Sequence, residues 1–243
     1  MNSFSSGKTL PDIILYEDRD IIVCHKPAGI PVQTGRIGTQ DMASILKNHL
    51  ASEQETPGKA GREPYLAIIH RLDQPVEGLL VFAKTPSAAK ELSRQLTSSG
   101  FGKYYRALVC GHPHPAEGTL ENYMVKDART NSSRVCTENT PGAKKARLHY
   151  RTMETAEETS LLEIHLDTGR HHQIRVQMAA LGCPIAGDRK YGKDPACQSS
   201  TAAAPSAAST DRIPLQLCAY RLEFRHPASG RPMHFELPWQ PAH

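Results

Sequence analysis

The sequence lacks the features that mark membrane, secreted and metal-binding proteins. None of its apolar runs approaches the ~20 residues that a membrane-spanning helix needs. Residues 1–8 contain no apolar core of the kind found in secretory signals. The six cysteines are widely scattered and form no CxxC pair, so neither a zinc ribbon nor a redox dithiol is indicated. These absences predict a soluble cytoplasmic protein with reduced thiols.

A large excess of charge of one sign is also missing. The formal net charge is +4, and 39% of the 243 residues are hydrophobic, enough to fill a sizeable core. The bases are nevertheless clustered at Lys144–Lys145, at Arg170 with Arg175, and at Arg189–Lys190. Each cluster by itself is typical of a solvated surface, but together they suit a phosphate backbone.

Predicted strands outnumber predicted helices, and most are joined by short turns. This pattern predicts an α+β fold with a mixed, mainly antiparallel sheet and flanking helices. Residues 1–11 are expected to form a flexible tail, and residues 194–210, which have low complexity, a disordered loop. Because the sequence has no internal repeat and no shift in composition, residues 12–243 are expected to form one domain, large enough to be a catalytic domain.

Helix boundaries can be predicted from capping residues. Asp41 precedes an amphipathic segment and is expected to cap it. Thr85 is the expected N-cap of a second helix with Pro86 at its first position, and Gly100 is expected to close it. A third helix is expected after Arg170.

Strands follow from apolar runs and alternation. Two β-prone runs within residues 13–24 predict a hairpin. Residues 103–109 alternate, which places Tyr105 on one face of a half-buried strand. Residues 112–143 are expected to be loop-rich with only short strands.

The chemically richest stretch is the turn at residues 70–78. It places His70, Arg71 and Asp73 within four residues, directly before an apolar strand. A carboxylate beside a cation at the mouth of a strand can be held ionised and ready for chemistry. A surface salt bridge would be the ordinary interpretation of this turn alone.

Several blocks in one order carry a family resemblance. They are residues 14–18 and 23–29, 70–73 with 78–84, 104–111, 168–178 with 182–192, and 217–222 with 226–227. Together they resemble the RluA-type pseudouridine synthases from about residue 13 to residue 238. The chain resembles the family's catalytic domain only, without the small S4-type RNA-binding module that many relatives carry.

The resemblance implies a pseudouridine synthase fold with a central RNA-binding cleft. It also implies isomerisation of a uridine in structured RNA, either ribosomal or transfer RNA, after the base is flipped out. Asp73 would be the nucleophile or would assist departure of the uracil, and attack at the ribose or at the ring stays open. Tyr105 would stack on the uracil, and Arg175, with Arg170 as second choice, would keep Asp73 ionised.

Other residues are expected at the RNA rather than in the chemistry. Arg71 would meet the RNA or support the turn, and His70 is expected to be structural or to bind backbone. The expected RNA-binding set is Arg71, His70, Arg170, Lys144, Lys145, Arg189 and Lys190.

No cofactor is expected, because isomerisation conserves atoms and the sequence has no phosphate-binding glycine loop. A metal site at His165, His171 and His172 with Asp167 is disfavoured, because adjacent histidines point to different faces. We expect a monomer whose only partner is RNA.

One departure from the family pattern is visible. Val76–Glu77 stands where many relatives have Thr-Ser, which affects RNA contacts rather than the nucleophile. The alternative functions are an inactive RNA-binding or chaperone-like relative and a glycoside hydrolase. The hydrolase would need a second carboxylate, for which Glu77 is the nearby candidate.

Overall fold

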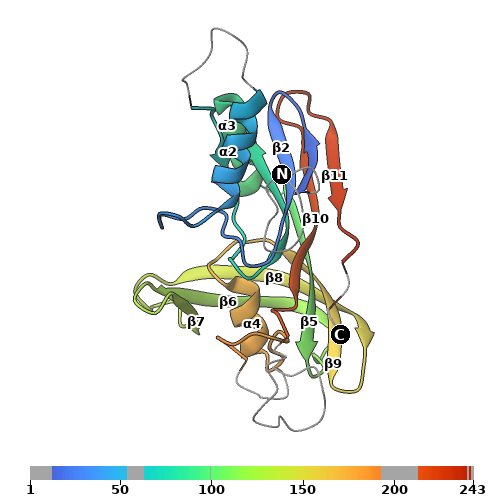
Figure 1. Cartoon of the computed structure of the whole chain (residues 1–243). Coiled ribbons are helices and arrows are strands. Elements are labelled where there is room, and N and C mark those ends of the chain that lie inside the picture. The colour runs from blue at the N-terminus through green and yellow to red at the C-terminus, as the bar shows by residue number, and fades with distance from the viewer. Residues whose placement is uncertain (1–12, 54–62, 99, 193–212, 240, 242–243) are drawn as a thin grey trace. The chain divides into compact units, whose positions relative to one another are not determined.

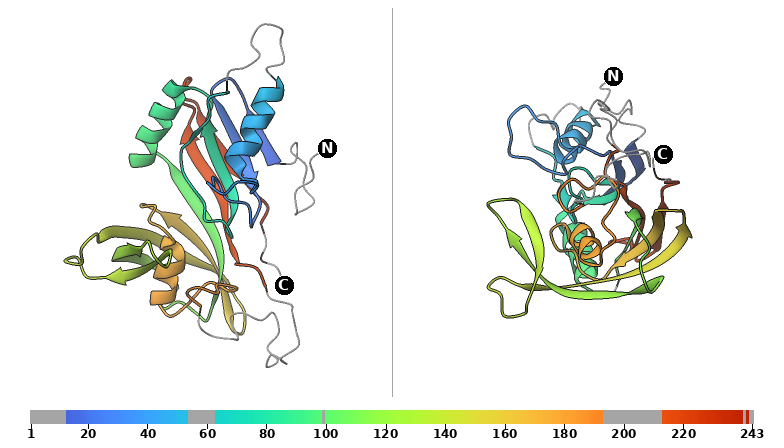
Figure 2. Two further views of the ribbon diagram at one scale, coloured as in Figure 1. Left: turned by 60° about the vertical axis from the view of Figure 1, so that its left-hand side comes forward. Right: turned by 90° about the horizontal axis from the view of Figure 1, so that it is seen from below.

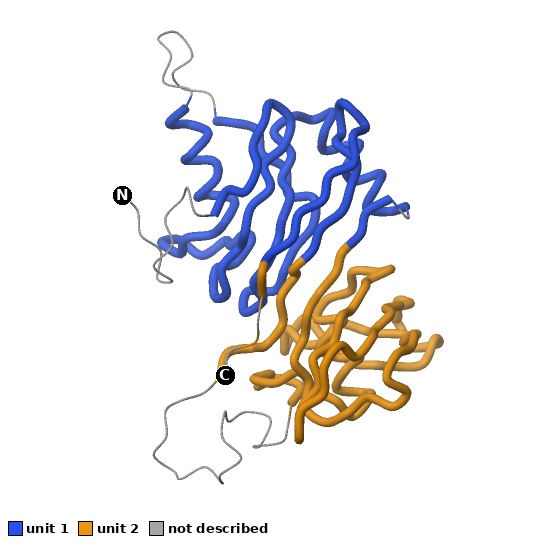
Figure 3. The backbone as a smooth tube through the Cα atoms, turned by 90° about the vertical axis from the view of Figure 1, so that its right-hand side faces the viewer, with its two compact units in different colours: residues 1–102, 221–237 blue, residues 103–220, 238–243 orange. Residues whose placement is uncertain are grey.

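The computed structural model describes residues 13–53, 63–98, 100–192, 213–239 and 241. The tail predicted at residues 1–11 and the loop predicted at 194–210 lie outside these ranges. The chain forms two compact units, coloured separately in Figure 3. Unit 1 comprises residues 1–102 and 221–237, and unit 2 comprises residues 103–220 and 238–243.

Unit 1 is a small sheet with two helices beside it (Figures 1 and 2). Its strands are joined in the order β1-β2-β4-β10, with β3 paired to β4 and β11 to β10. The pairs β1–β2, β2–β4, β3–β4 and β10–β11 are antiparallel. The elements are β1 (Ile14–Glu17), β2 (Ile21–Lys26), α2 (Met42–Glu53), β3 (Ala67–Ile68), β4 (Glu77–Ala83), α3 (Pro86–Thr97) and β11 (Pro232–Glu236), with the second half of β10 (Leu217–Arg225).

Unit 2 contains the remaining strands, with one helix packed on them. Its order is β10-β5-β9-β8-β6-β7, and the first half of β10 belongs to it. Helix α4 packs through Val176 against Met124 and Ala146 of the sheet. The elements are β5 (Gly102–Cys110), β6 (Glu117–Asp127), β7 (Ser132–Cys136), β8 (Lys144–Thr155), β9 (Thr159–Leu166) and α4 (Gln173–Ala180).

The expected fold class is confirmed, and so are most local signals. Asp41 accepts a hydrogen bond from the Ser44 backbone N–H at 2.7 Å at the start of α2. Thr85 caps α3 by accepting from Ala88 N–H at 3.2 Å, with Pro86 in the first turn. The hairpin predicted within residues 13–24 forms from β1 and β2.

Three expectations were wrong. Helix α3 ends at Thr97, with Ser98 as its C-cap, rather than at Gly100. Residues 112–143 contain the 11-residue strand β6 and the strand β7. One face of the first half of β6 is exposed, and Met124 is its one buried residue, so few apolar residues mark the strand and the usual strand signal is weak. Cys110 is disulfide-bonded, whereas Cys24, Cys136, Cys183 and Cys218 are not in disulfides.

Within the described ranges, none of the helices is both long and apolar enough to cross a bilayer.

Candidate active site

Asp73 lies in unit 1, on the turn between β3 and β4. Buried Leu72 and Val76 anchor the turn on either side, and Val76 N–H donates to the Asp73 carbonyl at 3.0 Å. The half-buried Asp73 side chain is therefore carried by a turn whose neighbours are fixed in the core. Gly78 follows with a φ of 135°, a conformation that L-residues with side chains rarely adopt.

Lys26, at the end of β2, stabilises the turn through hydrogen bonds to backbone carbonyls. Its side chain is fully buried, and its ammonium donates to the carbonyls of Pro27 (2.9 Å), Ile30 (2.7 Å) and Gln74 (3.0 Å). The Gln74 carbonyl also accepts from Gly29 N–H at 2.8 Å. Loop 27–30 and the residue next to Asp73 are thus held to one ammonium group.

Burial lowers the pKa of Lys26 to about 8, against the opposing attraction of Asp73 and Glu77. The charge of Lys26 therefore acts on the carboxylate of Asp73 from within unit 1. Sequence reasoning placed Lys26 in a matching block but gave it no role. A lysine directly after an apolar strand and before Pro-Ala-Gly was the signal available.

His70 and Glu77, on either side of Asp73, contact other residues of unit 1. His70 accepts a hydrogen bond from Val81 N–H at 3.3 Å, and its ring meets Phe101 edge-on with centroids 5.4 Å apart. Glu77 lies 3.6 Å from His25. Arg71 is exposed beside Asp73, where solvent or a ligand can reach it.

Tyr105 lies in unit 2, on β5. Lys103, Tyr105 and Ala107 alternate as the buried face of the strand, as predicted for Tyr105. Tyr105 stands opposite Ile164 of β9 and is only 7% exposed. A buried tyrosine has one face fixed by packing, which favours a defined ring orientation.

Arg175, in α4, is oriented by a buried carboxylate. Its Nε donates to Asp188 Oδ2 at 2.8 Å and its Nη2 to Asp188 Oδ1 at 2.7 Å. Burial alone would raise the pKa of Asp188, but the hydrogen bonds and charge of Arg175, with two backbone N–H groups, bring that pKa below its usual value. The guanidinium also lies 5.1 Å from the ring centroid of Tyr191.

Two histidines precede α4, and both serve the local structure. His172, with a φ of 55°, hydrogen-bonds Tyr191 at 2.7 Å, and His171 hydrogen-bonds Ser133 at 2.9 Å. Tyr191 also accepts from the backbone N–H of Ser133 at 2.9 Å, so the β6–β7 hairpin is tied to this segment. Burial lowers the pKa of His171 to about 4 and that of His172 to about 3, so both are neutral at physiological pH.

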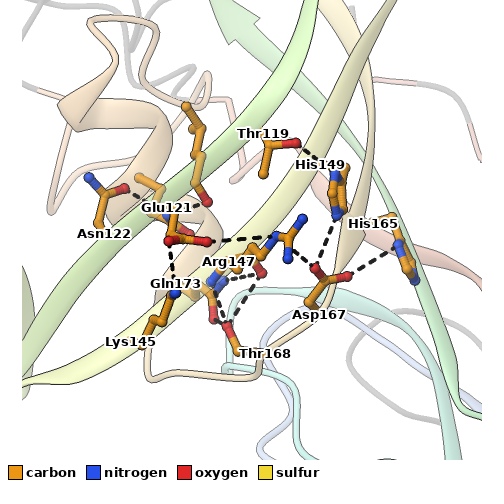
Figure 4. Close-up of polar contacts among 12 residues, drawn as sticks. Thr119, Glu121, Asn122, Lys145, Arg147, His149, His165, Asp167, Thr168 and Gln173 are labelled. Atoms are coloured by element: carbon orange, nitrogen blue, oxygen red, sulfur yellow. Dashed lines mark hydrogen bonds and ion pairs between the residues drawn. The ribbon is translucent and has the colours of Figure 1, made fainter. Parts of the chain in front are cut away.

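The basic residues of unit 2 that are expected to bind RNA differ in whether their charged groups already have partners in the protein. Arg170 donates to the Lys145 carbonyl at 2.8 Å, and Lys145 pairs with Glu121 at 2.8 Å (Figure 4). Lys190 donates to the carbonyls of Thr130 and Asn131 at the hairpin tip. Lys144 and Arg189 are exposed.

Two groups of described residues carry metal-ligand types within reach of one another: Glu17, His49 and Glu53, and Asp18, Asp20 and His226. Carboxylates of both groups already form ion pairs or hydrogen bonds with neighbouring side chains. Glu17 binds Lys84 at 2.6 Å and His49 at 2.7 Å, and Asp18 accepts from His226 at 2.8 Å. Neither group includes the histidine set weighed from the sequence.

Comparison with known proteins gives these features a class. Residues 20–180 match the family described as RNA pseudouridylate synthase. The chain is 38% identical over 240 residues to the ribosomal large subunit pseudouridine synthase D of Nitrosomonas europaea, and this match covers 96% of the chain but 63% of that relative's length. It is 35% identical over 231 residues to the dual-specificity RNA pseudouridine synthase RluA of Salmonella typhimurium, covering 93% of the chain and 92% of the relative.

The fold agrees. The structure titled human RNA pseudouridylate synthase domain containing 4 superposes with a TM-score of 0.72 at 23% identity, covering 95% of this chain and 90% of that one. The chain belongs to the RNA pseudouridylate synthase family. Its activity is isomerisation of uridine to pseudouridine in RNA, and the inactive RNA-binding alternative is not favoured.

Proposed function

We propose that Asp73, Tyr105 and Arg175 are the catalytic residues and that the substrate is a uridine in ribosomal or transfer RNA. The observation that carries the proposal is the Asp73 turn. Its carboxylate is half-buried, flanked by core residues and subject to the charge of buried Lys26. Such a fixed carboxylate suits attack on a substrate that must be aligned accurately.

Each residue has a distinct part. The N1–C1′ bond of the flipped uridine breaks, the uracil turns, and a C5–C1′ bond forms. Asp73 acts as nucleophile or assists departure of the uracil. Tyr105 stacks on the ring with its hydroxyl near the C5 proton to be removed. Arg175, held by Asp188, supplies positive charge to Asp73 when RNA excludes water.

RNA binding is assigned to the remaining bases. Arg71 and His70 flank the nucleophile, although the contacts of His70 support a structural part better. In unit 2 the proposed set is Arg170, Lys144, Lys145, Arg189 and Lys190. The name of the Nitrosomonas europaea relative favours ribosomal RNA as a substrate class. The name of the Salmonella typhimurium relative gives it dual specificity for RNA, and we propose transfer RNA as the second class. We further propose that both units work as one catalytic domain, as a monomer, without a cofactor, in the cytoplasm.

The test is pseudouridine mapping of total RNA from cells lacking the gene and from cells complemented with variants. A site that disappears on deletion should return with the wild-type gene and with Asp127→Asn, an exposed carboxylate at the end of β6. It should not return with Asp73→Asn, because the amide is a poor nucleophile with no charge. Restoration by Asp73→Asn would show that the proposed mechanism is wrong.

A further inference from the structure

Lys103 is a buried cation next to the proposed catalytic tyrosine. Its side chain is 9% exposed and shares the buried face of β5 with Tyr105. Since Tyr104 pairs with His165, Lys103 lies beside Leu166, and its stem packs in an apolar row that continues to Leu148. This face is also the one that α4 covers.

The Lys103 ammonium has no close partner in the described part of the chain. Its ammonium forms neither a hydrogen bond nor an ion pair within 4 Å with any residue described there. Burial lowers the pKa of Lys103, while the charge of Asp167 acts in the opposite direction. The Lys103 Nζ atom is not among the fully buried polar atoms, so it keeps contact with solvent while the rest of the residue is largely buried. The stem therefore fixes the position of a charge that a ligand can reach.

Asp167 is already engaged by other groups. Its carboxylate lies 3.2 Å from Arg147, 3.0 Å from His149 and 3.7 Å from His165, as Figure 4 shows. The attraction it exerts on Lys103 is therefore shared with three nearer side chains. The ammonium remains able to bind another anion.

Space for that anion lies beside Gly169, in the exposed loop between β9 and α4. A Cβ built on Gly169 would come 3.7 Å from Lys103 Nζ and would meet no other heavy atom within 4 Å. The backbone of Gly169 is not in the left-handed region, so its conformation does not require glycine. The missing side chain instead leaves the ammonium approachable from the exposed loop.

We propose that the Lys103 ammonium binds a phosphate oxygen of the RNA strand that carries the target uridine, and so positions that strand along Tyr105. The inference rests on the proposed function, because it takes Tyr105 to be the residue that meets the base. RNA offers one phosphate per nucleotide, and a lysine binds phosphate as a point charge. The ammonium lies at the exposed loop beside Gly169 and not at the ring of Tyr105. This position favours a phosphate rather than the uracil as its ligand.

The experiment measures affinity and its salt dependence. A fluorescein-labelled RNA hairpin with uridines in its loop is titrated with protein by fluorescence anisotropy at several KCl concentrations. Lys103→Met should raise Kd on the order of fivefold and reduce the slope of log K against log[KCl] by about 0.7–0.9, the contribution of one phosphate contact. Lys103→Arg should retain most of both. Gly169→Ala should weaken binding in the same direction, because its methyl group occupies the phosphate position.

Controls separate this role from a structural one. Lys90→Met removes an exposed charge of α3 and should change neither Kd nor slope. The Tm of Lys103→Met should not fall, because methionine keeps the packing of the stem. A lowered Tm with unchanged Kd, or a slower single-turnover rate with an unchanged salt slope, would each overturn the phosphate assignment. Asp73→Asn, measured beside it for product formation, reports on the proposed function independently of these affinities.

Discussion

Replacing Lys26 by methionine tests the idea that a buried ammonium holds the Asp73 turn. Methionine keeps an unbranched apolar stem in a site with no exposed surface, and it removes all three N–H donors. The carbonyls of Pro27 and Ile30 lose the donors seen in the structure, whereas the Gln74 carbonyl keeps its bond from Gly29 N–H.

The effect on global stability is a difference between two opposing contributions. Two buried carbonyls left without donors cost about 1–3 kcal/mol each. Because burial lowers the pKa of Lys26 from 10.5 to about 8, keeping it protonated in the folded chain costs about 3 kcal/mol, which the substitution relieves. The free energy of unfolding should therefore change by no more than about 3 kcal/mol.

Activity should respond far more strongly than stability. Without the shared ammonium, loop 27–30 and the turn beside Asp73 are no longer held together at that point, and a misplacement of about 1 Å can cost on the order of 100-fold in rate. We expect that loss in single-turnover pseudouridine formation at saturating RNA, with Kd for RNA little changed.

The pH dependence gives a second measurement. The folded pKa of Lys26 lies below its unfolded value, so the unfolded chain binds more protons between pH 8 and 10.5 and wild-type stability rises with pH in that window. The wild-type rate should fall above about pH 8 as the ammonium loses its proton. Lys26→Met should lack both trends.

The matched control is Lys47→Met, which removes an exposed ammonium paired with Glu63. It should leave the rate and the pH profile unchanged. A Lys26→Met rate within about threefold of wild type, or a rate loss explained entirely by the unfolded fraction in urea titrations, would show that Lys26 does not position Asp73.

Two further predictions concern the segment around α4. Asp188→Asn should lower the free energy of unfolding by about 3–5 kcal/mol in urea titrations, because it leaves the buried Arg175 charge without its carboxylate. Glu91→Gln, which breaks a surface pair with Arg94, should leave stability nearly unchanged, and equal effects would contradict the assignment. Burial lowers the pKa of His172 from 6.5 to about 3. Between these two pH values the imidazole of His172 binds a proton in the unfolded chain but not in the folded one. The contribution of His172 to the free energy of unfolding should therefore fall by about 1.4 kcal/mol for each pH unit by which the pH falls. His172→Asn should flatten this acid dependence between about pH 4 and 7, and an unchanged slope would show that His172 is protonated in the folded chain.

Local signals in the sequence were sufficient for most secondary structure. The caps at Asp41 and Thr85 depend on hydrogen bonds to N–H groups three residues away, so they can be predicted without the rest of the chain. The alternation that buries Tyr105 is equally local. The length of strand β6 was underestimated because its partners on both sides, β7 and β8, stabilise a strand whose own residues are largely polar.

The family and the Asp73 turn could also be predicted without a structure, since both reside in contiguous motifs. The contacts that hold those motifs in place are visible only in the folded chain. Lys26 reaches Gln74 across 48 positions, and Arg175 is oriented by Asp188 rather than by a neighbour on its own helix. Burial of Lys103 depends on the packing of β5 against β9 and β8. Such partners are chosen by how strands and loops meet in space, and a linear pattern of residue types does not encode the distances between them.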